Sequence, residues 1–148
     1  MTWEEAVEAS KSEPRKVLVD IYTDWCGYCK KMDKGTFTDA ELATYINENF
    51  YAVKFDAEQE EDILWNDVTF KFRPGKRRGA HELAISLLDG KMGYPSFVYL
   101  DEEFSRIMIS PGYKTAPMMQ KELVFAVEEH YKSQSWGDYK KTLKQGNP

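Results

Sequence analysis

The residue types and spacing that best suit chemistry are the two cysteines of the segment Cys26-Gly27-Tyr28-Cys29, the only cysteines in the 148 residues. Two thiols three positions apart on one helical turn can close a disulfide without rearrangement of the backbone. Thiol–disulfide exchange, metal binding and a permanently closed structural disulfide are the chemistries that this spacing admits.

The position of Cys26 favours thiol–disulfide exchange. The segment follows an apolar run and precedes a Lys-rich, Met-containing stretch, so we expect Cys26 at the junction of a strand and a helix N-terminus. The unpaired amides and the dipole of such a terminus stabilise a thiolate, and they can lower the pKa of a thiol from about 8.5 to about 3.5–7.5. Cys26 is therefore the candidate nucleophile. Cys29, a turn further in and expected to be less exposed, is the candidate resolving thiol.

The other two chemistries have less support. Structural zinc needs four ligands, and the chain adds only His81 and His130 to the two thiols. An iron–sulfur cluster also needs four ligands, usually thiolates. A structural disulfide stays open as an alternative, although so short a loop constrains the unfolded chain little. We predict no metal and no organic cofactor.

Asp20 is the second candidate for chemistry. It interrupts the β-branched and aromatic run KVLVDIYTD, residues 16–24, which is typical of a strand buried on both faces. Desolvation in such a strand raises the pKa of an acid, which suits a general base near neutral pH. The alternative is an acid that reaches solvent at a strand edge.

The elements that must position these residues alternate between strands and helices. Thr2 with Glu5, and Thr38 with Glu41, have the spacing of a capping box ahead of an amphipathic helix. The first half is predicted as a helix over about 3–12, a strand over 16–24, a helix over about 39–49 and a strand over 50–57. Strand, helix and strand in this order predict a right-handed parallel crossover.

The second half contains an insertion over about residues 58–92, in which only a short helix over about 80–89 is legible. After it we expect a strand beginning at Pro95, a tight turn, an antiparallel strand over 105–110, a helix from Thr115 to about 133 and an extra helix over about 135–145. We expect one domain, residues 1–148.

Composition excludes several classes of function. The formal net charge is −5, which is a poor match to phosphate polyanions, so we expect no nucleic acid partner. The longest apolar runs fall far short of the roughly 20 residues of a membrane span. Hydrophobic residues make up 42% of the chain, too many for a disordered protein. Residues 1–16 show no secretory address.

The run VLVDIYTDWCGYCKKMDKGTF resembles the thioredoxin superfamily. The continuation FTDAELATYINENFYAVKFDAE is similar to the thioredoxin-like branch that includes the C-terminal domain of thiol:disulfide interchange proteins. The resemblance covers residues 3–57 and 93–132. It implies an α/β thioredoxin-like fold, a central mixed β-sheet flanked by helices, with the insertion placed before the cis-Pro loop.

The resemblance also assigns roles to particular positions. Cys26 matches the nucleophile, Cys29 the resolving thiol, and Asp20 the buried acid that assists proton removal from the resolving cysteine. Tyr94-Pro95 matches the cis-proline loop that faces the active disulfide, and X-Pro is the kind of bond for which the cis form costs little. The backbone groups of that loop can pair with an extended substrate.

Further positions follow from the same resemblance. Lys54 matches a lysine near the buried acid and would support proton transfer. Substrate-binding roles fall to Trp25, Gly27, Tyr28, Tyr94 and Gly112. Trp25 is expected to shield the disulfide, and Gly112 to complete the peptide groove. Tyr28 stands where thioredoxin has proline, and Tyr94 is bulkier than the usual residue before the cis-proline, so the redox potential cannot be carried over.

The insertion carries a basic cluster over residues 71–78, formed by Lys71, Arg73, Lys76, Arg77 and Arg78. One interpretation is a docking site for an acidic partner. The other, which we favour, is a solvated loop that balances the acids at 58–62.

Together these observations predict a thiol–disulfide oxidoreductase that acts on protein disulfides, as a reductase. The alternatives are a disulfide oxidase or isomerase, and a redox-inactive binding module with the same fold. The expected partners are protein disulfide substrates and an upstream thiol/disulfide electron partner, with the chain itself a monomer. The resemblance favours a periplasmic or exported location, and the cytoplasm is the alternative.

Overall fold

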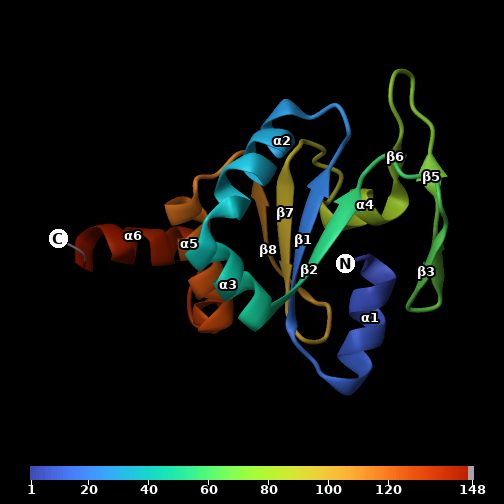
Figure 1. Cartoon of the computed structure of the whole chain (residues 1–148). Helices are drawn as coiled ribbons and strands as arrows, with labels where there is room; N and C mark the ends of the chain where they lie inside the picture. Colours follow the sequence, from blue (N-terminus) through green and yellow to red (C-terminus); the bar gives the residue numbers. More distant parts are fainter. Residues whose placement is uncertain (147–148) are drawn as a thin grey trace.

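The centre of the molecule is a four-stranded sheet of strand order β2-β1-β7-β8 (Figure 1). The computed structural model describes residues 1–146. The strands are β1 (Lys16–Tyr22), β2 (Phe50–Asp56), β7 (Ser96–Leu100) and β8 (Arg106–Pro111). β1 lies parallel to β2 and antiparallel to β7, and β7 lies antiparallel to β8. The expected mixed sheet is confirmed, and the predicted parallel pairing of β1 with β2 is present.

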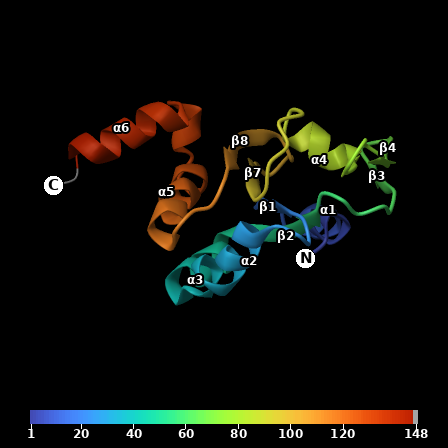
Figure 2. The ribbon, with the colours of Figure 1, turned by 90° about the horizontal axis from the view of Figure 1, so that it is seen from above.

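Helices cover both faces of this sheet. They are α1 (Trp3–Ser12), α2 (Gly27–Lys34), α3 (Ala40–Asn49), α4 (Glu82–Leu87), α5 (Ala116–Val127) and α6 (Trp136–Gly146), with short 3-10 turns η1 (Thr36–Thr38) and η2 (His130–Lys132). The view from above shows α1 and α4 on one side of the sheet and α2, α3 and α5 on the other (Figure 2). The result is a three-layer arrangement.

The alternation of side chains along β1 decides where the chemistry can lie. Val17, Val19 and Ile21 join the apolar core beneath α1 and α4. Leu18 joins the second core, beneath α2, α3 and α5. Because successive strand residues point to opposite faces, Asp20 shares the face of Leu18 and points toward the layer that contains α2.

Several predicted boundaries differ from the structure by one or more residues. β1 ends at Tyr22 rather than at residue 24. The N-cap of α3 is Asp39, whose carboxylate accepts a hydrogen bond from Leu42 N, and not Thr38. α5 ends at Val127 instead of near residue 133, because Glu129 adopts a left-handed conformation with φ 60° that no α-helix continues through.

The insertion folds into two small hairpins and α4. Its strands are β3 (Ile63–Trp65), β4 (Val68–Phe70), β5 (Phe72–Arg73) and β6 (Ala80–His81), paired β3 with β4 and β5 with β6. Asn66 and Asp67, both with positive φ, make a two-residue turn between β3 and β4. The indole of Trp65 packs edge-on against that of Trp3 at 5.2 Å, which fastens the insertion to α1.

The segment expected as an extra helix forms α6, which extends to one side of α5 in both views (Figures 1 and 2). Phe125 of α5 holds it through ring contacts with Trp136 at 5.3 Å and Tyr139 at 5.2 Å. Over residues 1–146, no helix has the length and apolar character that crossing a membrane requires.

Candidate active site

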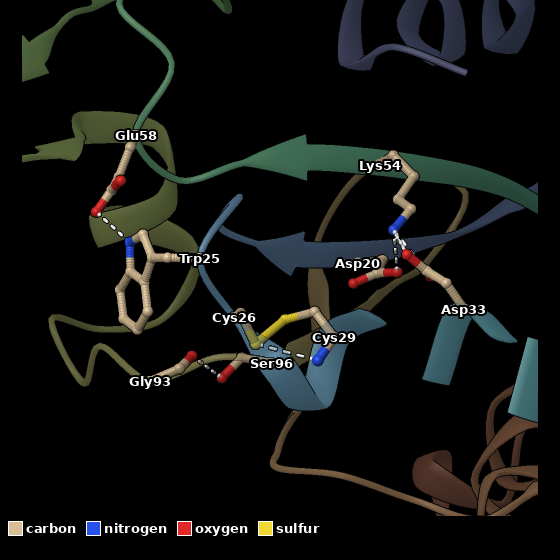
Figure 3. The surroundings of a disulfide bond; sticks show 9 residues. All are labelled: Asp20, Trp25, Cys26, Cys29, Asp33, Lys54, Glu58, Gly93 and Ser96. Atoms are coloured by element: carbon tan, nitrogen blue, oxygen red, sulfur yellow. Dashed lines mark hydrogen bonds and ion pairs between the residues drawn. A yellow bond between two sulfur atoms is a disulfide. The ribbon is translucent and has the colours of Figure 1, made fainter. Parts of the chain in front are cut away.

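The two cysteines lie at the N-terminus of α2, directly after β1, as the sequence predicts (Figure 3). They are joined in a disulfide with 5.3 Å between their Cα atoms. Cys26 is the N-cap of the helix, and its Sγ accepts a hydrogen bond from Cys29 N at 3.1 Å. Their exposed fractions are 5% and 4%, so in the oxidised form Cys26 is hardly more accessible than Cys29.

Asp20 belongs to a three-residue charge cluster on the side of β1 that faces the disulfide (Figure 3). Lys54 reaches from β2 and pairs with Asp20 at 3.4 Å. The same ammonium donates to both oxygens of Asp33 on α2, each at 3.0 Å. Asp33 was not singled out from the sequence, although it stands four residues after Cys29 on one helix, the spacing that places side chains on the same face.

Burial governs the ionisation of this cluster. Only 14% of the Asp20 side chain is exposed. Desolvation raises the pKa of Asp20 from 3.8 to about 6, against the opposing effect of Lys54 and with a further increase from the charge of Asp33. Burial alone would lower the pKa of Lys54. The negative charges of Asp20 and Asp33 have the larger combined effect, so the pKa of Lys54 is raised. The predicted pKa rise of Asp20 is therefore present, and it brings the titration close to neutral pH.

A cavity of about 180 Å³ adjoins the cluster and is lined by Asp20, Asp33 and Lys54 together with apolar side chains of the core. That volume can hold several water molecules. The carboxyl group of Asp20 thus has space beside it through which a proton can be relayed.

The loop expected to face the disulfide is built as the sequence suggests. The Tyr94–Pro95 peptide bond is cis. Ser96 Oγ donates to Gly93 O at 2.7 Å, and Gly112 N donates to Pro95 O at 2.8 Å. Gly112 has φ +95°, which a side chain would disfavour, so glycine has a local reason to stand there. The loops that hold Pro95 and Gly112 are thereby joined.

Trp25, beside the nucleophilic position, is held by the insertion. Its Nε1 donates to Glu58 at 3.0 Å, and the guanidinium of Arg78 lies over its ring at 4.4 Å. Arg78 also pairs with Glu58 at 3.4 Å, and the ring of Tyr94 packs edge-on against the indole at 5.8 Å. The indole is still 48% exposed. Glu58 and Arg78 were not assigned to the site from the sequence, because only the fold brings them to Trp25.

Tyr28, which lies between the two cysteines in the sequence, is exposed. Its ring lies 6.0 Å from that of Tyr113, over which Lys31 Nζ lies at 4.9 Å. At Gly27, a Cβ would meet no other atom within 4 Å, so this glycine leaves open space beside the sulfurs. Two exposed aromatic side chains, Trp25 and Tyr28, therefore stand within the segment that carries the two cysteines.

The basic cluster of the insertion is mostly paired with acids. Lys71 pairs with Asp62 at 2.7 Å, and Arg73 pairs with Glu82 at 3.2 Å. With the Arg78–Glu58 pair, two of the five basic residues meet acids from the 58–62 segment. This pattern favours the solvated-loop interpretation over docking of an acidic partner at the insertion.

A disulfide at a helix N-terminus, a buried acid behind it and a cis-proline loop beside it define a class of protein, and the comparison with known families agrees. The family described as the thioredoxin-like domain matches residues 3–126. The chain belongs to this family.

Individual relatives are similar over parts of the chain. Across 39 residues it is 49% identical to the thiol:disulfide interchange protein DsbD of Ralstonia nicotianae, a stretch that covers 26% of this chain and 6% of that protein. The chain therefore spans a small part of the length of this relative.

Two solved structures show the fold. A thioredoxin-fold protein from Helicobacter pylori is 20% identical with a TM-score of 0.67, covering 89% of this chain and 81% of that one. The reduced C-terminal domain of DsbD from Neisseria meningitidis is also 20% identical, with a TM-score of 0.53 and coverage of 83% and 96%. The predicted thioredoxin-like fold is confirmed.

Proposed function

We propose that this chain reduces disulfides in protein substrates, with Cys26 as nucleophile and Cys29 as resolving thiol. The observation that carries the proposal is the Cys26–Cys29 pair at the N-terminus of α2, where Cys29 N already donates to Cys26 Sγ. In the reduced protein the same amide and the helix dipole favour a thiolate at Cys26.

The reaction proceeds in two exchanges. The Cys26 thiolate attacks one sulfur of the substrate disulfide, which forms a mixed disulfide and releases the other substrate sulfur as a thiolate that takes up a proton. Cys29 then loses its proton and attacks Cys26 Sγ, which closes the Cys26–Cys29 disulfide and releases the second substrate thiol. Two electrons pass to the substrate, and an upstream dithiol partner must return them.

Asp20 takes the proton from Cys29 in the second exchange. A base titrating at about 6 is ionised at neutral pH yet still basic enough to accept a proton. Lys54 supports this role, because its charge opposes the desolvation that would otherwise keep Asp20 protonated. Direct transfer and transfer through water in the adjoining cavity both fit this role.

The substrate lies along the joined loops at Pro95 and Gly112. Their backbone groups offer hydrogen bonds to an extended chain. Trp25, Gly27, Tyr28 and Tyr94 surround the sulfurs and contact the residues next to the substrate disulfide. Trp25 is held in place for this purpose by Glu58 and Arg78.

Trapping of the mixed disulfide tests the mechanism. A Cys29→Ser variant, reduced and mixed with insulin as a disulfide-bonded substrate, should accumulate a covalent complex that dithiothreitol releases. The matched Cys26→Ser variant should trap none, because it lacks the attacking thiolate. Equal trapping by both variants, or by neither, would contradict the assigned roles.

A further inference from the structure

A second cavity, of about 740 Å³, lies between β8, α5 and α6, away from the cysteines. Its lining includes four lysines, Lys114, Lys121, Lys140 and Lys144. We propose that it binds an acidic, partly apolar segment of the protein whose disulfide is exchanged at Cys26. The inference rests on the proposed function for the identity of the partner, but the binding can be measured without it.

Charge is the first observation behind this inference. The whole chain is acidic, with a formal net charge of −5, yet this cavity gathers four basic side chains. Within the described residues, none of the four forms an ion pair with a carboxylate, whereas Lys71 and Lys54 elsewhere do. An unpaired positive cluster inside an acidic protein attracts acidic segments and speeds their encounter.

The single acid in the lining offsets only part of this charge, because Glu122 acts on Lys114 and Lys140 while the lining holds four lysines. Glu122 is buried, and its two oxygens accept hydrogen bonds from Tyr99 Oη at 3.0 Å and Ser110 Oγ at 2.7 Å. The carboxylate is thus directed at hydroxyl groups of the sheet. Lys121 and Lys140 remain exposed at the cavity and present their charge to solvent.

The apolar part of the lining indicates a peptide rather than a simple anion. Met118 is an exposed large hydrophobic residue, and Trp136 presents a ring with Lys140 Nζ 5.9 Å from its centre. Aromatic and methionine side chains beside cations suit a segment in which acidic and apolar residues alternate.

The position of the cavity connects it to the disulfide. Tyr113 lines the cavity, and its ring also lies beside that of Tyr28. Lys114 Nζ donates to Pro111 O at 2.9 Å and to Gly112 O at 3.0 Å, in the loop that is bonded to Pro95. A chain that crosses the sulfurs along this loop can therefore continue into the cavity.

The cavity also depends on a part of the chain that lies outside the stretch matched by the family. Trp136, Lys140 and Lys144 belong to α6 (Trp136–Gly146), which lies beyond the matched residues 3–126. The site that α6 helps to form is thus built partly from residues outside the matched domain.

The test measures binding in a protein that cannot exchange disulfides. The full chain with Cys26→Ser and Cys29→Ser is titrated, by fluorescence anisotropy, into a fluorescein-labelled peptide in which aspartate and glutamate alternate with leucine and phenylalanine. We expect saturable binding that weakens with salt, and a Kd that rises about tenfold or more when Lys121→Glu and Lys140→Glu are added. The matched control Lys141→Glu, an exposed α6 lysine outside the lining, should change Kd by less than about threefold.

Several results would overturn the inference. They are absence of saturable binding, equal weakening by Lys141→Glu, and binding of phosphatidylglycerol vesicles in place of the peptide. In a protein that retains both cysteines, adding Lys121→Glu and Lys140→Glu should lower kcat/KM about tenfold for the same peptide carrying an internal disulfide. The same variant should reduce a small neutral disulfide at an unchanged rate. If peptide binding persists but no disulfide is ever reduced, the proposed function fails and the binding site stands.

Discussion

Two carboxyl groups are buried beneath the same face of the sheet, Asp20 on β1 and Glu122 on α5, and their surroundings differ. Glu122 accepts two short hydrogen bonds, from Tyr99 and Ser110. Asp20 has an ion pair with the half-exposed Lys54 at 3.4 Å and, within the described residues, no hydroxyl donor. Burial raises the pKa of both acids, that of Asp20 to about 6.

The difference supports the proposal that Asp20 is the reactive acid and that Glu122 has a structural role. Both oxygens of Glu122 are committed to fixed hydroxyl groups, so a change in its protonation would break hydrogen bonds inside the core. Both acids line a cavity, but Asp20 accepts no hydrogen bond from a hydroxyl group within the described residues and shares its lysine with Asp33, so it can change protonation with little rearrangement. Burial alone therefore does not identify a general base, because the hydrogen-bond partners decide whether the proton can move.

The largest expected effect is on the rate of resolution of the mixed disulfide. Asp20→Asn should slow this step about 100-fold at pH 8, because a positioned general base contributes about that much or more. In the parent protein the rate should rise with pH through about 6, and this rise should disappear in the variant. Stopped-flow recording of tryptophan fluorescence measures both.

Glu122→Gln is the matched control for that rate, since it makes the same chemical change at the other buried acid. It should alter the exchange rate with a small disulfide by less than about twofold. A pH profile that depended on Glu122 and not on Asp20 would reverse the assignment of the two acids.

The next effect is on stability and has opposite signs at the two acids. The pKa of Asp20 is raised from 3.8 to about 6 in the folded protein. Asp20 therefore contributes fully to the free energy of unfolding below pH 3.8, and this contribution is lost as the pH rises through about 6. One pKa unit corresponds to about 1.4 kcal/mol. The difference in free energy of unfolding between Asp20→Asn and the parent protein should therefore shift by up to about 3 kcal/mol in favour of the variant between about pH 3.5 and pH 8.

Glu122→Ala should instead lose about 3 kcal/mol, because it leaves the hydroxyl groups of Tyr99 and Ser110 buried without their acceptor. Urea unfolding of the oxidised proteins measures both changes. If Asp20→Asn instead destabilised the protein at pH 8, the Asp20 carboxylate would be stabilised by Lys54 in the folded state by more than burial destabilises it, which would contradict the raised pKa.

A smaller effect is expected on the pKa of Asp20 when either of its charged neighbours, Lys54 or Asp33, is neutralised. Lys54→Met should raise the pKa of Asp20 further, because it removes the one cation that opposes desolvation. Asp33→Asn should lower that pKa, because it removes a neighbouring negative charge. Both changes should be less than about one pH unit, since the cluster is partly open to solvent. Carboxyl ¹³C shifts followed against pH distinguish them, and shifts in the same direction would contradict the pairing.

The smallest effect is expected where charge is exposed. Arg78→Ala removes a cation over Trp25, a contact worth about 0.5–1 kcal/mol in water, so KM for a protein disulfide should rise less than about fivefold. The neighbouring exposed Arg77→Ala is the control and should leave KM unchanged. A large loss of kcat in Arg78→Ala would mean that the guanidinium acts on the sulfurs themselves.

The regular elements could be predicted where local signals agree with the fold. The capping box of Thr2 and Glu5 is present in full. At the start of α3, Thr38 and Asp39 are adjacent residues that could each cap the helix. Thr38 does not cap it, because its hydroxyl donates to Gly35 O and Lys34 O in the preceding turn. A choice between adjacent capping residues depends on such neighbours.

The hairpins of the insertion were missed for a related reason. Leu64 and Val68 are apolar residues that are exposed in the structure, so apolar and polar residues along these strands do not alternate with burial in the way that identifies a strand from sequence. The turn residues Asn66 and Asp67 are the signal that could have revealed the first hairpin. Short strands beside a polar surface leave little else to detect.

The candidate site divides in the same way. The positions of Cys26, Cys29 and Asp20 were predictable because a strand and the next helix fix them locally. The contacts of Glu58 and Arg78 with Trp25 were not, because they depend on how a 35-residue insertion returns to the sheet.

The central claim, that Cys26 and Cys29 cycle between dithiol and disulfide, is tested most directly by equilibration in glutathione buffers of graded ratio. Alkylation followed by mass measurement gives the oxidised fraction, and tryptophan fluorescence gives an independent record. Because the proposed direction requires a reducing pair, we predict a reversible two-electron transition closer to the poise of thioredoxin, about −270 mV, than to that of an oxidant such as DsbA, about −120 mV. A value near −120 mV would make the protein an oxidant, contradicting the proposed direction, and a pair that never cycles would contradict the enzymatic function altogether.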